Sequence, residues 1–284
     1  MHQLDWIVLL LTIGGIVLYG SWKGREAKHS LKGFLLADRE LPWYHILLSV
    51  MATQASAITF LSVPGQAYTD GMRFVQFYLG LPIAMIVLSV TFIPQYYQLK
   101  IFTAYQFLEE RFDSKTRILT SFLFLIPRAL STGVTIAAPS IILSTLLGWD
   151  LTWTNCITAA VVTFYCIFGG SKTISYTQLL QMGVVLAGMV IAAIYIIQAL
   201  PQEIGMKESL QLAGKMGKIN LIDWKFDINN RYTIWSGIIG GFFLQLSYFG
   251  TDQSQVGRYL TGHTANESKK GLLLNGFLDR KSVV

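Results

Sequence analysis

The chain has 284 residues, of which 52% are hydrophobic and 13% are charged, and its mean hydropathy is +0.48. Soluble proteins carry about a quarter charged residues, so this composition excludes an ordinary soluble domain and indicates a polytopic membrane protein. The net charge of +6 would fit a nucleic-acid-binding protein, but the positions of the basic residues, described below, argue against that class.

Apolar runs of membrane length divide the chain into spans. About 20 apolar residues cross a bilayer once, and six complete spans are expected, at roughly 4–22, 43–65, 74–97, 118–147, 154–171 and 174–199. A seventh, at roughly 233–255, turns polar at its end, and an eighth starts at Gly271. No basic segment precedes the first span and no small-x-small site follows it, so we expect a retained helix rather than a cleaved signal peptide.

Lysine and arginine are distributed unevenly among the loops. One set of loops (23–42, 98–117, 172–173 and 256–270) holds thirteen of them, whereas Arg73 and the loop at 200–232 together hold six. Because cytoplasmic loops are enriched in these residues, we expect the first set in the cytoplasm and the N-terminus outside the cell or in the periplasm. The protein is then a multi-pass protein of the plasma (inner) membrane, in contact with lipid and without a nucleic-acid partner.

A polar cluster interrupts the second span, where residues 49–65 read SVMATQASAITFLSVPG. Its polar members lie within seven positions and are Thr53, Gln54, Ser56 and Thr59. One interpretation is a packing face of small residues that lets helices approach closely. The other is a locally unwound helix, whose freed carbonyls coordinate a cation and whose polar side chains face a substrate cavity.

Two further features of the spans leave alternatives open. Arg128, after Pro127, lies near the middle of its span, so it either faces a partner or cavity or extends to the cytoplasmic interface. Residues 168–183, FGGSKTISYTQLLQMG, predict a tight cytoplasmic turn at the glycine pair. The polar residues that follow the turn, Thr177, Gln178 and Gln181, either begin a helix near the headgroups or line a cytoplasmic exit path.

The seventh span contains a second polar interruption, in LQLSYFGTDQSQVGRYL at residues 244–260. This pattern fits either a helix end leaving the membrane or a second broken helix, which the glycines at 237, 240, 241 and 250 would permit. Two interrupted helices at corresponding positions are typical of inverted-repeat transporters.

Carboxylates are almost absent at membrane depth. Apart from Asp252, every Asp and Glu lies in a predicted loop or at the end of a segment, which disfavours a proton relay. A cation would be held mainly by carbonyl and hydroxyl oxygens, which suits a hard monovalent ion. Cys156 and Cys166 lie in one apolar run and suggest no disulfide framework. There is no P-loop, metal-ligand cluster or nucleophile–base pair, so we expect no enzyme.

Three segments resemble, in order, motifs of the sodium:solute symporter family. They are FLLADRELPWYHILLSVMATQASAITFLSVPGQAY, FGGSKTISYTQLLQ and SYFGTDQSQVGRYL. The resemblance runs from about Leu4 to Leu278. It implies an all-α polytopic membrane protein with a LeuT-type inverted-repeat core and one extra N-terminal helix. It also implies import of a small organic solute coupled to sodium by alternating access, with no other cofactor and no obligate protein partner.

The resemblance assigns roles to individual residues. The matching positions for sodium are the backbone carbonyls of Ala52 and Ala55. Those for the solute are Gln54, Ser56, Thr59, Tyr78, Gln245 and Tyr248. Thr59 and Tyr78 stand where sugar-carrying members have glutamine and glutamate, so we disfavour a sugar. Thr177-Gln178 stands where the family usually has threonine-aspartate, which argues against a role for a carboxylate at 178. Gly257 replaces a common glutamine before Arg258.

The end of the chain also departs from the family. The first repeat corresponds to about 43–199 and the second begins at about 233–278, so the eighth core helix, which completes the family's sodium site, is missing. Residues 279–284, DRKSVV, can be read in frame from GATCGGAAGAGCGTCGTG, part of a common sequencing adapter. We therefore expect a transmembrane domain truncated in its second repeat, at 1–278, and a foreign tail. A transporter-like sensor module of a signalling protein is the alternative function, and nothing in the sequence discriminates between the two.

Overall fold

The computed structural model describes residues 3–24, 31–201, 205–227 and 229–283. In these ranges the chain forms helices and one isolated bridge, between Leu41 and Gly262. In chain order the elements are α1 (Gln3–Gly24), α2 (Leu31–Leu36), η2 (Ala37–Arg39), α3 (Trp43–Gln54), α4 (Ala57–Asp70), η3 (Met72–Gly80), α5 (Leu81–Val90), α6 (Phe92–Gln98), α7 (Ala104–Arg111), α8 (Ser114–Leu147), α9 (Leu151–Gln198), α10 (Met206–Lys215), η4 (Ser236–Gly240, a π-helical turn), α11 (Gly241–Thr251), α12 (Gln253–Tyr259) and α13 (Ala265–Val283).

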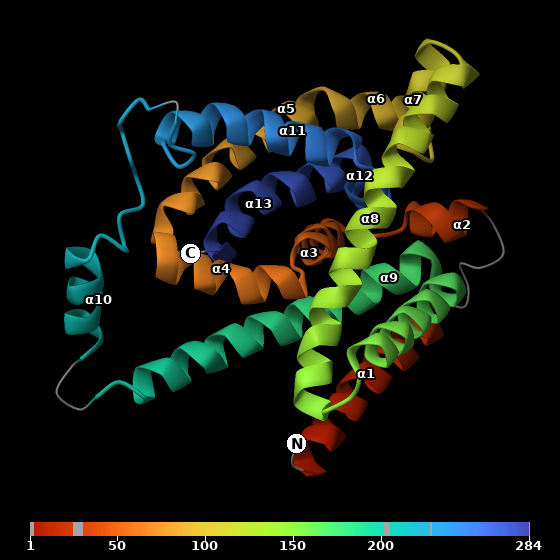
Figure 1. The fold of residues 1–284 in the computed structure, drawn as a ribbon. Helices are drawn as coiled ribbons and strands as arrows, with labels where there is room; N and C mark the ends of the chain where they lie inside the picture. Colours follow the sequence, from red (N-terminus) through yellow and green to blue (C-terminus); the bar gives the residue numbers. More distant parts are fainter. Residues whose placement is uncertain (1–2, 25–30, 202–204, 228, 284) are drawn as a thin grey trace.

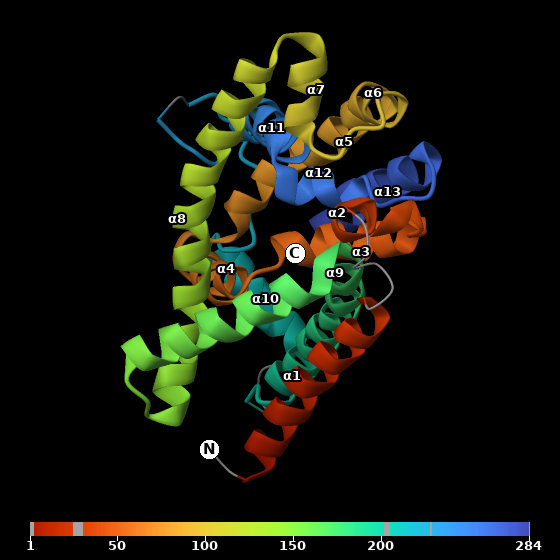
Figure 2. The same ribbon diagram turned by 90° about the vertical axis from the view of Figure 1, so that its right-hand side faces the viewer.

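Three helical stretches of the described chain are long and apolar enough to cross a membrane: Met72–Gln98, Ser114–Leu147 and Gly170–Gln198. Trp6–Tyr19 and Leu151–Thr163 are shorter apolar helices. α1 lies beside α9 in both views, and α8 crosses the bundle at an angle (Figures 1 and 2). These three helices carry many exposed large apolar side chains, as expected where lipid or further helices cover them.

The second predicted span is two helices, as the unwound interpretation expects. α3 ends at Gln54 and α4 begins at Ala57, with extended backbone between them. α4 continues through Pro64 to Asp70, beyond the predicted end of the span at residue 65.

The predicted reversal at the glycine pair lies inside the long helix α9. At Gly170 the backbone has φ 63° and ψ −178°, and the helix changes direction there (Figure 2). A positive φ favours glycine, and a Cβ at this position would lie 3.1 Å from Cδ2 of Phe34. The non-helical backbone at Gly170 therefore divides α9 into two helical stretches, as the two predicted spans expect.

The main hydrophobic core joins helices from the first third of the chain to helices near its end. It contains Ile46 and Val50 from α3, and α5, α6, α11, α12 and α13 supply most of the remainder. Two backbones come very close at one side of this core, where η3 meets η4 and α11. A Cβ on Gly237 or Gly241 would lie 2.3 Å from the carbonyl oxygen of Gln76 or Phe77, respectively.

The last helix, α13, runs to Val283 and includes most of the expected foreign tail. Val284 lies outside the described residues, as do Arg25 and Lys28 of the positive-charge count, and side chains from 279 onward are not described.

Candidate functional site

The first break is built by two residues with extended backbone. Ala55 has φ −69° and ψ 98°, and Ser56 has φ −110° and ψ 162°. Serine is a favoured N-cap, and Ser56 Oγ accepts a hydrogen bond of 3.2 Å from the backbone N–H of Thr59. The two hydroxyl oxygens of Ser56 and Thr59 lie 3.1 Å apart. Ser56 therefore starts α4 and brings two predicted solute-binding hydroxyls together.

The same break leaves carbonyl groups at the end of α3. The last four carbonyls of any helix have no donor within that helix, and here these belong to residues 51–54 with Ala55 just beyond. Ala55 N–H still reaches back to the carbonyl of Met51, at 3.0 Å. Ala52 is half-buried and packs against Leu47, Met51 and Met182. Gln54 is half-buried at the last position of α3. Carbonyls at an interrupted membrane helix can coordinate a monovalent cation.

The predicted exit-path residues on α9 have three different environments. Thr177 is buried, and its hydroxyl donates to the carbonyl of Ile174 at 2.9 Å, whereas Gln181 is exposed. Gln178 is half-buried and hydrogen-bonds to α3 through Ser49 and Thr53. Sequence reasoning missed Ser49, although it lies one helical turn before Thr53 and therefore on the same face.

The second break lies at Asp252, between α11 and α12, where φ is −71° and ψ is 115°. The predicted glycine positions are not the break, since Gly237 and Gly241 serve instead for close packing against η3. Asp252 Oδ1 accepts a hydrogen bond of 2.8 Å from the N–H of Ser254 and so caps α12. Burial and then the charge of Asp252 raise the pKa of Tyr105 to about 12.

The alternative interpretations of Arg128 can now be compared with its surroundings. Its guanidinium lies 3.7 Å from the carboxylate of Asp252, and the two side chains are 39% and 19% exposed. The arginine therefore faces a partner at the second break, as intramembrane cations generally do.

The remaining predicted solute residues lie on α11 and η3. Tyr248 accepts a hydrogen bond of 2.9 Å through its hydroxyl oxygen from Gln255 Nε2, so it is held within its own broken helix. Gln245 is half-buried on α11, and Tyr78 is half-buried on η3.

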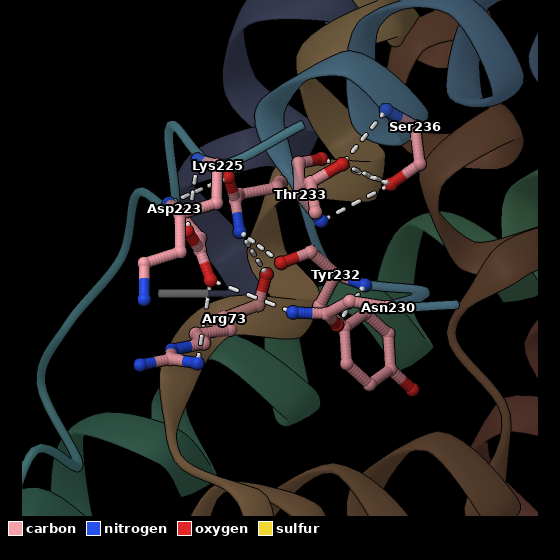
Figure 3. A network of polar contacts seen from close by, with 8 residues as sticks. Arg73, Asp223, Lys225, Asn230, Tyr232, Thr233 and Ser236 are labelled. Atoms are coloured by element: carbon pink, nitrogen blue, oxygen red, sulfur yellow. Dashed lines mark hydrogen bonds and ion pairs between the residues drawn. The ribbon is translucent and has the colours of Figure 1, made fainter. Parts of the chain in front are cut away.

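A polar network that the sequence did not predict ties η3 to the segment before η4 (Figure 3). Gln76, 1% exposed, donates to the carbonyl of Tyr232 at 3.0 Å and accepts from the N–H of Asp223 at 3.0 Å. Arg73 lies 3.4 Å from the carboxylate of Asp223. Gln66, on α4, donates to the hydroxyl of Tyr232 at 2.6 Å. The network thus reaches from α4 to the beginning of the second broken helix.

Two interrupted helices within one helical membrane fold are the arrangement that the sequence motifs implied. The profile of the sodium:solute symporter family matches residues 34–276. The chain belongs to this family. It is a multi-pass membrane protein, and the predicted motifs are those of its family.

Relatives and a solved structure agree with this assignment. The chain is 34% identical over 276 residues to sodium-coupled monocarboxylate transporter 1 of Xenopus laevis, covering 95% of this chain and 43% of the relative. It is 32% identical over 273 residues to the human sodium/iodide cotransporter, covering 94% and 41%. Both are named as transporters and neither as an enzyme. The chain therefore spans less than half the length of these curated relatives.

The fold itself is confirmed by a solved structure, described as the substrate-bound outward-open state of a Na⁺-coupled sialic acid symporter. The TM-score is 0.82 at 24% identity, over 98% of this chain and 57% of that one. The expected all-α, LeuT-type architecture is correct.

Proposed function

We propose that the protein, in its full natural length, is a sodium-coupled symporter that imports a small organic solute by alternating access. The observation that carries this proposal is the break between α3 and α4, which leaves helix-end carbonyls beside two hydroxyl groups. A regular helix would satisfy those carbonyls internally. The break therefore costs the fold hydrogen bonds, and a bound cation would compensate for that cost.

We assign the sodium ion to the backbone carbonyls of Ala52 and Ala55. Ser56 and Thr59 then face the solute together with Gln54, and Tyr78, Gln245 and Tyr248 contribute from η3 and α11. Coupling to sodium rather than to protons is favoured because Asp252, the carboxylate at membrane depth, is paired with Arg128 and caps a helix.

We propose that the solute is an anion. The relatives above are named for monocarboxylates and iodide, and the solved structure for sialic acid, all anions at neutral pH. The substitutions at Thr59 and Tyr78 further disfavour a sugar.

We place residues 23–42, 98–117, 172–173 and 256–270 on the cytoplasmic side of the plasma membrane, with the N-terminus outside. On that orientation Gln178 is on the cytoplasmic half of the bundle, next to the part of α3 that precedes the break. The path by which sodium leaves then passes between α3 and α9.

The test is uptake into proteoliposomes that contain the full-length protein. Small carboxylates, iodide and sugars are offered with an inward sodium gradient or with choline in its place. We expect sodium-dependent uptake of at least one anion and none of the sugars. Anion uptake that is equal in choline would contradict sodium coupling. Binding without uptake of any solute would favour the sensor alternative. Because the chain spans less than half the length of its curated relatives, we expect residues 1–284 alone to insert but not to transport.

A further inference from the structure

A closed ring of three hydrogen bonds joins α3 to α9 just before the first break. Ser49 Oγ donates to Gln178 Oε1. Gln178 Nε2 donates to Thr53 Oγ1 at 3.0 Å, and Thr53 Oγ1 donates to the backbone carbonyl of Ser49 at 2.7 Å. Each hydroxyl hydrogen is used once, and both ends of the glutamine amide have a partner on α3.

The chemistry of this ring requires an amide at position 178. An amide accepts through its oxygen and donates through its nitrogen, whereas a carboxylate accepts only. With a carboxylate at 178, Thr53 would have to donate to it and would leave the carbonyl of Ser49. The glutamine that replaces the usual family aspartate thus fits the two hydroxyls opposite it.

The ring lies where it can control the position of α3. Thr53 is one residue before Gln54, the last residue of α3. The apolar cluster beside the ring is small, and its buried members are Leu47, Met51 and Met182. Ala52, between Ser49 and Ala55, packs against that cluster. Hydrogen bonds between helices are therefore a large part of what attaches α3 to α9.

We propose that Gln178 is a positioning residue that holds α3 against α9. The hydrogen-bonded ring of Ser49, Thr53 and Gln178, called the clasp below, must open before sodium can leave toward the cytoplasm. The inference rests on the proposed function. It differs from a role in lining the exit path, because it requires Ser49 and Thr53 as much as Gln178. Closing the clasp holds the carbonyls of Ala52 and Ala55 in the arrangement that binds sodium, and opening it releases α3.

The test measures how readily a cysteine on α3 is reached from the cytoplasmic side. Leu48→Cys is introduced into the full-length protein after Cys156→Ser, Cys166→Ser and replacement of any further cysteine. Leu48 is half-buried against the α3–α9 cluster. A membrane-impermeant maleimide is applied to inside-out vesicles, in sodium and in choline. The labelling rate is compared between Gln178→Leu, Ser49→Ala with Thr53→Val, the combination of all three, and Gln198→Leu.

We expect Gln178→Leu and the Ser49/Thr53 pair each to raise the labelling rate in sodium about fivefold or more, since each removes both bonds between the helices. Combining them should add little, because they break the same ring. Gln198→Leu removes an exposed amide from the last residue of the same helix and should label like the parent. The apparent affinity for sodium should fall in the first two variants and not in the last.

The proposal would be overturned if Gln178→Leu were labelled at the same rate as the parent. Strictly additive effects of the glutamine and hydroxyl substitutions would also overturn it. If Gln178→Leu does not fold, the milder Ser49→Ala with Thr53→Val decides the question alone. Failure of the proposed function is separate, because it appears as absent sodium-driven uptake in the parent while the labelling differences persist in choline.

Discussion

The two breaks in the membrane helices are anchored to different extents. On one side of the first break, α3 is attached to α9 by one ring of hydrogen bonds and three buried apolar residues, and to the main core through Ile46 and Val50. On the other side, none of the α4 side chains that the structure describes is buried. Between α11 and α12 the chain lies in the main core, where Phe249, Val256 and Tyr259 are fully buried. Tyr96 also donates to the carbonyl of Gly250 at 2.9 Å, and Gln253 accepts from the N–H of Ala104 at 2.8 Å.

This difference indicates which half of the site moves. Elements with few buried apolar contacts open at low free energy, whereas core elements open only with the whole domain. The α4 side of the first break can therefore change position without disturbing the second break, and the second break supplies a fixed reference for the solute.

The largest effect is expected where η4 and α11 meet η3. Gly237→Ala or Gly241→Ala places a methyl group 2.3 Å from a backbone carbonyl oxygen, so the two helices must separate. Overpacking of this kind costs about 1–3 kcal/mol and sometimes more. Thermal unfolding in detergent should show a clear fall in the midpoint for both variants.

Gly240→Ala is the matched control, because nothing lies within 4 Å of its Cβ position. It should leave the midpoint unchanged or raise it slightly, since alanine favours a helix over glycine. Equal behaviour of Gly240 and Gly241 would mean that the second broken helix is not fixed by this backbone contact.

Tyr96→Phe should have the next largest effect. The phenol is 2% exposed, and its loss leaves the carbonyl of Gly250 without that donor beside the second break. A buried unsatisfied group costs about 1–3 kcal/mol, so the unfolding midpoint should fall. Tyr195→Phe, at a side chain 72% exposed, should not change it. An unchanged midpoint in Tyr96→Phe would mean that the hydrogen bond from Tyr96 to Gly250 does not anchor the second break.

The sequence predicted the first break better than the second, for a physical reason. Ser56 is a local capping signal, and the structure has α4 start one residue later. The glycines of the seventh span also indicated a break, but a glycine pattern cannot distinguish flexibility from close packing. Gly237 and Gly241 pack on η3, and the break is instead at Asp252, which caps α12.

Partners distant in the chain could not be predicted at all. Ser49 and Gln178 are 129 positions apart, and the pairing of Arg128 with Asp252 depends equally on how helices pack. A single sequence shows that a polar residue in a span needs a partner, but not which one. The spans themselves could be predicted because their apolar length is a local property.

A smaller effect, on binding rather than stability, is expected at Thr59. Thr59→Val keeps nearly the same volume and removes the hydroxyl that lies 3.1 Å from Ser56 Oγ. Loss of one hydrogen bond to the solute costs about 0.5–1.5 kcal/mol, or about a two- to tenfold loss of apparent affinity. Solute uptake at saturating sodium measures it in the full-length protein, and the affinity for sodium should be spared.

Thr145→Val is a matched control for this substitution, because Thr145 is exposed on α8 and its hydroxyl bonds only within its own helix, to the carbonyl of Ile141. It should leave the solute affinity unchanged. Normal affinity in Thr59→Val as well would mean that Thr59 packs rather than binds, and the small-residue packing interpretation would regain support.

The smallest effect is expected at Ala52, and its smallness is informative. If Ala52 acts through its carbonyl, Ala52→Ser leaves the ligand atom in place, and the half-buried site beside Met182 has to accommodate only one hydroxyl. The sodium dependence of uptake should then stay within about twofold of the parent.

Ser56→Ala is the contrasting variant, because removal of the N-cap weakens the start of α4 by about 0.5–2 kcal/mol and lets the helix continue through the break. It should lower the apparent sodium affinity several-fold. A severe loss in Ala52→Ser with normal sodium affinity in Ser56→Ala would place the ion away from the first break, so that the more movable of the two breaks would no longer be the one that holds sodium.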